Sequence, residues 1–344
     1  MIKNLSDNFT IFFKRIYKKL LSKYSYIFKS SLVCIICIPI FLKLFNWVIF
    51  KFNWNVVISN LPLFAFGSFP TSKIWRPIVW IIYIFILFCL SVLNFNKKWI
   101  NRNLLFGWIS SIPLGVFLLY GGIGLSPVMT RNWGGLTLTI FLTICSLFLS
   151  LPIGIALAFC RQSSLIIVKK ISSIYIDIMR AIPLISVLFF GQLLIPLFLP
   201  YGVEVDRVWR AIFAFTMFLS AYIAEDIRGG LQSIPYTQIE AANSLGLNQY
   251  QIMWFVEIPQ SIQIALPALT NQSIGLLQNT SLMSILGLVE LLGVGRSILA
   301  NPEFIGQYIE VYIWLASVYW LICTMIAILS RNLEKKILVR KSYF

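Results

Sequence analysis

Residues 135–159 read GLTLTIFLTICSLFLSLPIGIALAF, a long run without a single charged side chain. A helix needs about 20 consecutive apolar residues to cross the roughly 30 Å hydrocarbon core of a bilayer, so this run predicts a transmembrane helix. Seven other runs are long and apolar enough to do the same, at 31–50, 77–95, 104–123, 174–199, 209–225, 264–290 and 307–330. The sequence therefore predicts about eight transmembrane helices.

The composition extends this interpretation to the whole chain. Of its 344 residues, 59% are hydrophobic and only 12% are charged, whereas soluble domains carry roughly 25% charged residues. A chain so rich in apolar side chains is also not disordered. We expect an all-α integral membrane protein that crosses the membrane several times.

The distribution of positive charge orients the predicted helices. The chain carries 28 Lys and Arg against 12 Asp and Glu, a formal net charge of +16. Lys and Arg collect on cytoplasmic loops, and most of them fall on the side of the N-terminus when the eight spans are threaded. We therefore expect both termini in the cytoplasm. The positive charge favours anionic lipid as a partner. Because the chain lies in a membrane, we do not expect nucleic acid as a partner.

The predicted spans divide the chain into four regions. Residues 1–30 place apolar and basic side chains at helical spacing, which is typical of an amphipathic helix on the inner membrane surface; a partner-binding helix is the alternative. Residues 31–125 form an N-terminal extension with three spans, and residues 126–330 form a core with five spans. Residues 331–344 form a basic cytoplasmic tail.

The sequence offers little for catalysis, metals or cofactors. There is no histidine, the commonest proton shuttle and metal ligand. Cys34 and Cys37 have the C-x-x-C spacing but lie inside a predicted span without a second pair, so we interpret them as membrane packing. The chain has no Gly-Lys dipeptide and hence no phosphate-binding loop of the ATPase type. We expect a non-catalytic protein without cofactors or metals.

The longest predicted cytoplasmic connection, residues 226–262, contains SIPYTQIEAANSLG at 233–246. Thr237 is followed three residues later by Glu240, which matches a capping box and predicts a helix that starts at Gln238.

The end of this short helix is also visible in the sequence. Gly246 suits the left-handed conformation that follows a helix, and Asn248 can cap a second short helix that runs to Val256 and is closed by Pro259. A helix of about eight residues is marginal on its own in water. It must dock either on the chain's own helix ends or on a separate soluble protein.

The spacing of this loop matches a known pattern. Glu240-Ala241-Ala242, then Gly246 after three residues and Pro259 further on, resembles the EAA loop of binding-protein-dependent ABC transporter permeases.

Three further segments resemble the polar amino acid branch of that family: NWGGLTLT at 132–139, YIDIMRAIPL at 175–184 and SAYIAEDIRGG at 220–230. The resemblance covers about residues 130–330, and the extended N-terminal half is similar to the longer permease of general L-amino acid import systems.

The resemblance implies the permease subunit of an ATP-driven importer of L-amino acids in the bacterial cytoplasmic (inner) membrane, with a five-helix core. Such permeases pair in the membrane, here with a sibling or an identical subunit, and each inserts its EAA helix into a groove on one subunit of an ABC ATPase dimer. A periplasmic or tethered binding protein delivers the amino acid. ATP hydrolysis would belong to the partner ATPase.

The resemblance also implies roles for individual residues of the loop. Glu240 would form a salt bridge with the ATPase or cap its own helix, Ala241 and Ala242 would permit close approach, and Gly246 would supply the bend. Pro259 would complete this coupling segment.

The predicted span 264–290 is unusually polar. Ser273, Thr280 and Ser284 share a face at helical spacing, and polar side chains at membrane depth are tolerated where they face protein or a watery cavity. This pattern favours a substrate path. Contacts between helices and bonds to preceding carbonyls are the alternatives.

In the family, part of this span usually reads K-D-T-S-L, and the Asp can hold the α-amino group of the substrate. Here it reads Gln278-Asn279-Thr280-Ser281-Leu282. Asn279 keeps the capacity for hydrogen bonds but lacks the charge. The ammonium group would then be read by the partner permease or only by the binding protein.

Four charged residues are candidates for a gate or for structural ion pairs. Asp177 and Arg180 are three residues apart and would pair at the membrane edge. Glu225 and Arg228 lie at the cytoplasmic end of a predicted span, where a gate role and simple solvation at the membrane interface are both open.

Two other classes of membrane protein fit the sequence less well. An ion-coupled secondary transporter should show buried carboxylates and paired half-repeats, and neither is evident. An integral membrane enzyme is disfavoured because catalytic groups are missing.

Overall fold

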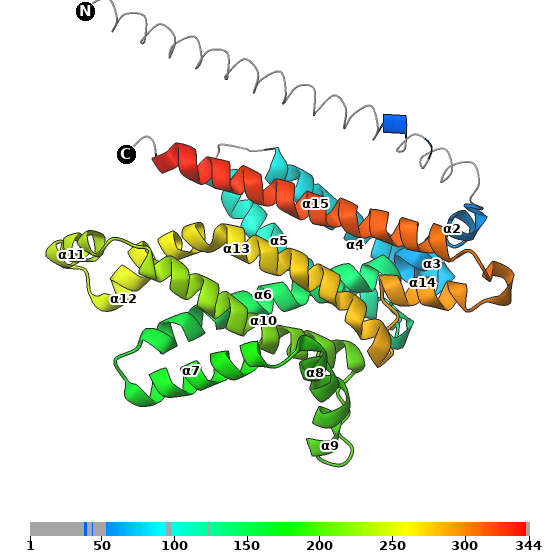
Figure 1. The fold of residues 1–344 in the computed structure, drawn as a ribbon, viewed down its shortest axis with the longest axis horizontal. Coiled ribbons are helices and arrows are strands. Elements are labelled where there is room, and N and C mark those ends of the chain that lie inside the picture. Colours follow the sequence, from blue (N-terminus) through cyan, green and yellow to red (C-terminus); the bar gives the residue numbers. More distant parts are fainter. Residues whose placement is uncertain (1–37, 40–42, 44–52, 94–97, 123, 342–344) are drawn as a thin grey trace, which may run out of the picture. The chain divides into compact units, whose positions relative to one another are not determined.

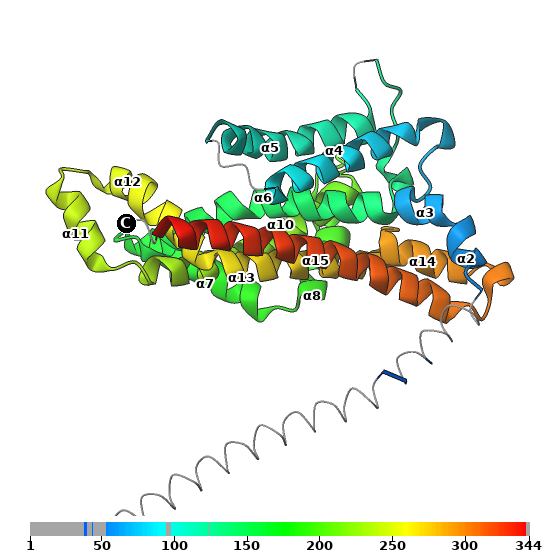
Figure 2. The same cartoon turned by 90° about the horizontal axis from the view of Figure 1, so that it is seen from above.

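The computed structural model describes residues 38–39, 43, 53–93, 98–122 and 124–341. The chain forms two compact units, Met1–Trp54 and Asn55–Phe344, and the second holds nearly all of the described residues. The predicted amphipathic helix at 1–30 and most of the predicted span at 31–50 lie outside the described residues and stay predictions. Figures 1 and 2 show the helices of the second unit in two views.

The second unit is built from helices. Its α-helices, in chain order, are α2 (Asn55–Ser59), α3 (Leu61–Phe66), α4 (Trp75–Val92), α5 (Lys98–Tyr120), α6 (Gly135–Gln162), α7 (Ile166–Ala181), α8 (Leu184–Phe189), α9 (Ile195–Phe198), α10 (Arg207–Gln232), α11 (Tyr236–Ser244), α12 (Gln249–Ile252), α13 (Ile258–Asn279), α14 (Leu291–Leu299) and α15 (Tyr308–Lys341). Two π-helical segments and one long 3₁₀ segment interrupt them: η3 (Phe190–Leu194), η4 (Met253–Glu257) and η5 (Thr280–Leu286).

Within the described residues, six helical segments are long and apolar enough to cross a membrane. They are α4, α5, α6, α10, the segment Gln249–Leu286 and α15. Each corresponds to one of the predicted spans, which confirms the all-α membrane fold. The total number of spans and the side on which the termini lie stay predictions.

The predicted span 174–199 is not one straight helix. It consists of the end of α7 and a second helical segment from α8 to α9, and the two segments meet at 107°. Ile182 at the break is extended, with φ −86° and ψ 136°. The cause is Pro183, which disfavours the helical conformation of the residue before it and has no N–H to donate. The predicted span therefore corresponds to a bent pair of helical segments.

The centre of the bundle is formed by α6 and α10, which lie along each other, with α7 and α13 packed on both (Figure 1). Phe141 and Phe215 are fully buried between these helices. Gly154 allows α10 to approach α6, because a Cβ atom there would lie 2.5 Å from the Cγ2 atom of Ile223. Small residues at such crossings are typical of helix packing in membranes.

The N-terminal extension continues as a helical hairpin of α4 and α5 beside α6 (Figure 2). The buried indole of Trp80 donates to the Ser111 carbonyl at 2.9 Å, which joins the two helices. At the start of α4, the buried guanidinium of Arg76 donates to the Ser126 carbonyl at 2.8 Å. The hairpin is thus tied both internally and to the segment that leads into α6.

The bundle has two ends, which both views separate clearly. α11 and α12 lie at one end, here called the loop end, and α2, α3 and α14 lie at the other, here called the α14 end (Figures 1 and 2). At the α14 end, the Gly135 N–H donates to the Val289 carbonyl at 3.0 Å. Gly135 has φ +59°, and a Cβ atom there would lie 2.4 Å from the Phe64 carbonyl oxygen. Three segments therefore meet at the first residue of α6.

Candidate functional site

At the loop end, α11 begins at Tyr236, two residues before the predicted Gln238. Its N-cap is Pro235, without a side-chain capping bond, and the Gln238 N–H donates to the Pro235 carbonyl at 3.0 Å. The predicted capping box of Thr237 and Glu240 was wrong. Proline has a φ that is compatible with a helix, and its missing N–H would have no partner at the start of a helix in any case. The helix therefore starts directly after Pro235, and Thr237 falls inside its first turn.

The end of α11 follows the prediction. Gly246 adopts φ +80°, and its N–H donates to the Asn243 carbonyl at 2.9 Å. Asn248 and Gln251 then form a capping box, each side chain bonded to the other's backbone N–H at 2.9 Å. The tight turn after α11 and the cap of the next helix are both confirmed.

The sequence predicted that Pro259 closes a helix, and this prediction was wrong. The chain continues from α12 through the π-helical η4 into α13, and Pro259 lies in the first turn of α13. The missing N–H of proline is tolerated there because the π-helical segment before it shifts the hydrogen-bond pattern. The loop is therefore joined to α13 by continuous helical backbone.

Exposed side chains cover most of α11 and the turn after it. Glu240 and Ala241 are exposed, whereas Ala242 is buried. The loop also exposes large apolar side chains at Tyr236, Leu245, Tyr250, Trp254 and Phe255. Sequence reasoning did not single out these five. The sequence feature that could have identified them is the presence of aromatic and aliphatic residues in an otherwise polar connection.

The α11 surface, defined as Tyr236, Glu240, Ala241 and Leu245, lies outside every candidate membrane span. Leu245 is 81% exposed and Tyr236 is 69% exposed. Exposed apolar side chains away from the lipid mark a surface for protein interaction. Within the described residues, the α11 surface is therefore exposed and suited to contact with a protein.

Helices α6, α7 and α10 carry a cluster of charges centred on Glu225. Its carboxylate lies 3.2 Å from Arg161 and 3.5 Å from Arg180, and also binds Arg228. Arg161 makes a second ion pair with Asp177 at 3.0 Å. Among the described residues, the predicted Asp177–Arg180 pair is replaced by these contacts. Arg161, at the end of α6, had not been singled out.

The residue after Glu225 links this region to the polar helix. Gln272 of α13 donates to the carboxylate of Asp226 at 3.1 Å. The charge cluster and α13 are thus bonded to adjacent residues of α10.

The residues predicted to line a substrate path lie in α13 and in η5. Three of their hydroxyls donate to the carbonyl three or four residues earlier, at 2.8 Å for Ser273, 2.7 Å for Thr280 and 2.8 Å for Ser284. Thr280 is fully buried, while Asn279 and Ser281 are half-buried. Bonds to preceding carbonyls use the donor of each hydroxyl and leave its acceptor sites.

The predicted shared face of Thr280 and Ser284 was wrong. α13 ends at Asn279, and the chain continues as the 3₁₀ segment η5. With three residues per turn, positions four apart no longer lie on one side. Gly287 then adopts φ +84°, so the span ends at Leu286 rather than at residue 290.

Amide side chains of α13 remain uncovered in the described unit. Asn271 and Gln278 are exposed, and Gln272 is half-buried. Polar groups at membrane depth require a protein partner or water. Asn271 and Gln278 therefore call for a protein or water partner, whereas Gln272 is already bonded to Asp226.

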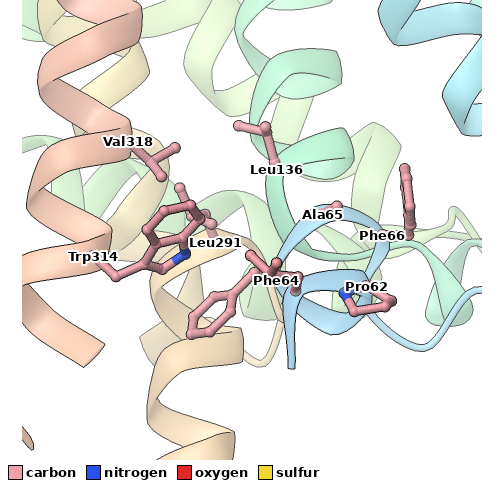
Figure 3. Close-up of a pocket in the computed structure, with 9 residues that line it drawn as sticks. Pro62, Phe64, Ala65, Phe66, Leu136, Leu291, Trp314 and Val318 are labelled. Atoms are coloured by element: carbon pink, nitrogen blue, oxygen red, sulfur yellow. The ribbon is translucent and has the colours of Figure 1, made fainter. Parts of the chain in front are cut away.

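A cavity of about 360 Å³ lies at the α14 end, between α3, α6, α14 and α15 (Figure 3). Its walls are almost entirely apolar and come from Leu61, Pro62, Phe64, Ala65, Phe66, Leu136, Leu291, Trp314 and Val318. A cavity with so little polar surface on its walls does not suit an amino acid. Within the described residues there is also no cluster of three or more His, Cys, Asp or Glu that could hold a metal.

Comparison with known proteins matches this architecture. Residues 150–339 match the family described as binding-protein-dependent transport system inner membrane component. YhdY, an inner membrane amino-acid ABC transporter permease protein of Escherichia coli K12, is 33% identical over 344 residues, covering 93% of this chain and 91% of that protein. BztC of Rhodobacter capsulatus, a glutamate/glutamine/aspartate/asparagine transport system permease protein, is 32% identical over 300 residues. The aligned region covers 83% of this chain and 68% of BztC.

A solved structure agrees. A crystal structure of an amino acid ABC transporter with histidines superposes with a TM-score of 0.52 at 30% identity, covering 59% of this chain and 92% of the solved one. The chain therefore belongs to the family of binding-protein-dependent transport system inner membrane components, and is the multi-pass, non-catalytic permease subunit of an amino-acid ABC transporter whose ATPase is a separate subunit.

Proposed function

We propose that this permease couples ATP hydrolysis to amino-acid import through the α11 surface, and that α13 and η5 line the path of the amino acid. Permeases of this family work with an ATPase and a substrate-binding protein. The observation that carries the proposal is the exposed, largely apolar α11 surface outside the membrane spans. Glu240, Ala241, Ala242, Gly246 and Pro259 belong to this coupling segment.

Several features support docking of α11 in a groove on one subunit of an ATPase dimer. Leu245 and Tyr236 supply apolar contact area, and Glu240 supplies a charge that can pair with a basic side chain. Ala241 is small and exposed, so it lets another backbone come close. The side chains of Gln238 and Gln260 are bonded at 2.6 Å, so a movement of α11 is passed to the first turn of α13.

The amino-acid path would run along the polar side of α13 and η5, past Ser273, Asn279, Thr280, Ser281 and Ser284. The exposed amides Asn271 and Gln278 lie on another face of α13, which a single chain leaves uncovered. A second permease, a sibling or an identical copy, would cover them and complete the channel.

The substrate class follows from the same positions. The Asn279 amide and the Ser281 hydroxyl can donate to a carboxylate or an amide without supplying a negative charge for the ammonium group, whereas Ser273, Thr280 and Ser284 keep only acceptor sites. BztC is named for glutamate, glutamine, aspartate and asparagine. We infer that the substrates are acidic or amide amino acids, delivered by a periplasmic or tethered binding protein that reads the ammonium group.

The protein would lie in the bacterial cytoplasmic (inner) membrane, as the name of YhdY indicates for that relative. Both termini and α11 would lie on the cytoplasmic side. The basic segments 1–30 and 331–344 would then meet anionic lipid of the inner leaflet. Residues 31–125 would form the extension and 126–330 the permease core.

The ion pairs around Glu225 would hold α6, α7 and α10 together near the inner end of the path. Arg180, Arg228 and Asp177 belong to this group of ion pairs. Separating these three helices would break several ion pairs at once, so we expect α6, α7 and α10 to move together.

Docking of α11 is tested by co-purification of the ATPase subunit with the tagged permease. Glu240→Lys should reduce the ATPase recovered by about tenfold, because it puts a like charge against a basic groove, at a cost of about 1.4 kcal/mol. Glu303→Lys is the matched control, since Glu303 is an exposed glutamate near the α14 end. Equal recovery with both variants would contradict docking through Glu240.

A further inference from the structure

Glu290 is a fully buried carboxylate at the α14 end. It is the N-cap of α14 and accepts hydrogen bonds from the backbone N–H groups of Leu292 and Gly293, each at 2.9 Å. It also accepts the hydroxyl of Tyr319 on α15 at 3.1 Å. Burial raises the pKa of this carboxyl, which lies outside the candidate spans, and the three donors oppose the rise.

The chain on either side of Glu290 is bonded to the start of α6. The Leu291 N–H donates to the buried hydroxyl oxygen of Thr139 at 3.2 Å. The Val289 carbonyl accepts the Gly135 N–H at 3.0 Å. Through these bonds Glu290 lies at a junction of α6, α14 and α15.

The same junction holds η5, the last part of the proposed path. The Leu288 N–H donates to the Met283 carbonyl of η5 at 3.1 Å. Arg296 of α14 donates to the Ser284 hydroxyl at 3.3 Å. The position of η5 is therefore set by α14, and Tyr319 sets the position of α14 against α15.

Side-chain packing around the junction is incomplete. Leu291, directly after Glu290, lines the apolar cavity together with Leu136 of α6 and with Trp314 and Val318 of α15 (Figure 3). Such space removes dispersion contacts between the helices that border it. Hydrogen bonds to the buried carboxylate thus carry more of the attachment of α14 than they would in a filled interface.

We propose that Glu290 and Tyr319 are positioning residues for transport: their hydrogen bond, here called the outer tie, makes η5, α14 and α15 move as one block when the permease changes its access. The role rests on the proposed path along η5. Neither residue needs to touch the substrate. The tie keeps η5 at a fixed distance from α15 while the loop end is moved by the ATPase.

Two substitutions separate the tie from the helix cap. Glu290→Asp keeps a residue that caps helices well but is one methylene shorter, so it caps α14 without reaching Tyr319. Tyr319→Phe keeps the glutamate cap and removes the hydroxyl. Tyr312→Phe is the matched control, because Tyr312 is an exposed tyrosine on the same helix.

The test uses the complete complex in proteoliposomes with its ATPase, partner permease and binding protein. It measures uptake of L-glutamate, L-aspartate, L-glutamine and L-asparagine per ATP hydrolysed, together with the KM for uptake. Each single variant should lower uptake per ATP by about tenfold, the factor for loss of a hydrogen bond to a charged group. The double variant should be no worse than Tyr319→Phe alone, because that variant already removes the bond to Glu290 together with the contacts of the hydroxyl to Thr280 and Thr139.

Wild-type uptake per ATP in Tyr319→Phe would overturn the proposal. So would a loss confined to the yield or thermal stability of the complex, which is what a merely structural bond would give. Additive effects in the double variant would show that the two residues act separately and would also overturn it. Asn279→Ala keeps the tie intact; if it leaves uptake unchanged while the tie variants lower it, the proposed path fails and the tie stands.

Discussion

At the scale of single residues, the ion pairs around Glu225 show how a membrane protein places charge at moderate cost. Three guanidinium groups approach one carboxylate that is 20% exposed. Removing a carboxylate of this kind leaves its cationic partners without compensation, and that penalty is larger than the net gain of any one pair. Asp177 is different, because its side chain is 59% exposed and its pair with Arg161 is screened by water.

Glu225→Gln should therefore destabilise the complex by about 1–3 kcal/mol, the range for lost hydrogen bonds to charged groups. Asp177→Asn should have a much smaller effect. The measurement is the thermal unfolding midpoint of the detergent-solubilised complex. Equal shifts for the two variants would show that Glu225 is no more than a surface charge.

At the scale of elements, the backbone junction at the start of α6 attaches α3 of the N-terminal extension to the core. Gly135 combines a left-handed conformation with contact to the Phe64 carbonyl, so a side chain would meet both strain and a clash. Gly124 has a similar conformation, φ +79°, but nothing lies within 4 Å of its would-be Cβ atom. A comparison of substitutions at these two glycines therefore distinguishes the effect of conformational strain from the effect of close packing.

Gly135→Ala should lower the unfolding midpoint clearly more than Gly124→Ala, with an extra cost of about 1–3 kcal/mol from overpacking. Both variants carry the strain of a left-handed alanine, so the difference reports the contact alone. The measurement is again thermal unfolding of the solubilised complex. If both variants unfold at the same temperature, α3 is not held closely against α6.

The elements also show what could be predicted from the sequence. Runs of apolar residues locate helices well, because the bilayer demands length and hydrophobicity and little else. They contain no information on backbone direction, so the 107° break was missed although Pro183 marked it. The change from α13 to η5 was missed for the same reason.

Local rules of helix capping succeeded where the partners are neighbours in the chain, as for Asn248 and Gln251. They failed at Thr237, where the preceding proline had already started the helix. The outer tie could not be predicted at all. Glutamate is not a favoured N-cap, and its partner Tyr319 lies on another helix, so only the tertiary structure brings them together.

At the scale of the whole molecule, the two ends of the bundle have different tasks in this account. The loop end offers an apolar surface with Glu240 for the ATPase, and the α14 end holds η5 through the outer tie. α13 connects the two, since it follows the coupling loop without a break in helical backbone and leads directly into η5. On the proposed function, a push at α11 would be transmitted along α13 to the proposed path.

On the proposed function, α11 couples ATP hydrolysis to transport. The most direct test is the ATPase activity of the complete complex in proteoliposomes, with the binding protein and a panel of L-amino acids, for wild type and Glu240→Lys. We predict that substrate stimulates hydrolysis in the wild type and that this stimulation is lost in Glu240→Lys. Full stimulation in the variant would contradict the coupling role and leave Glu240 as a surface residue of α11.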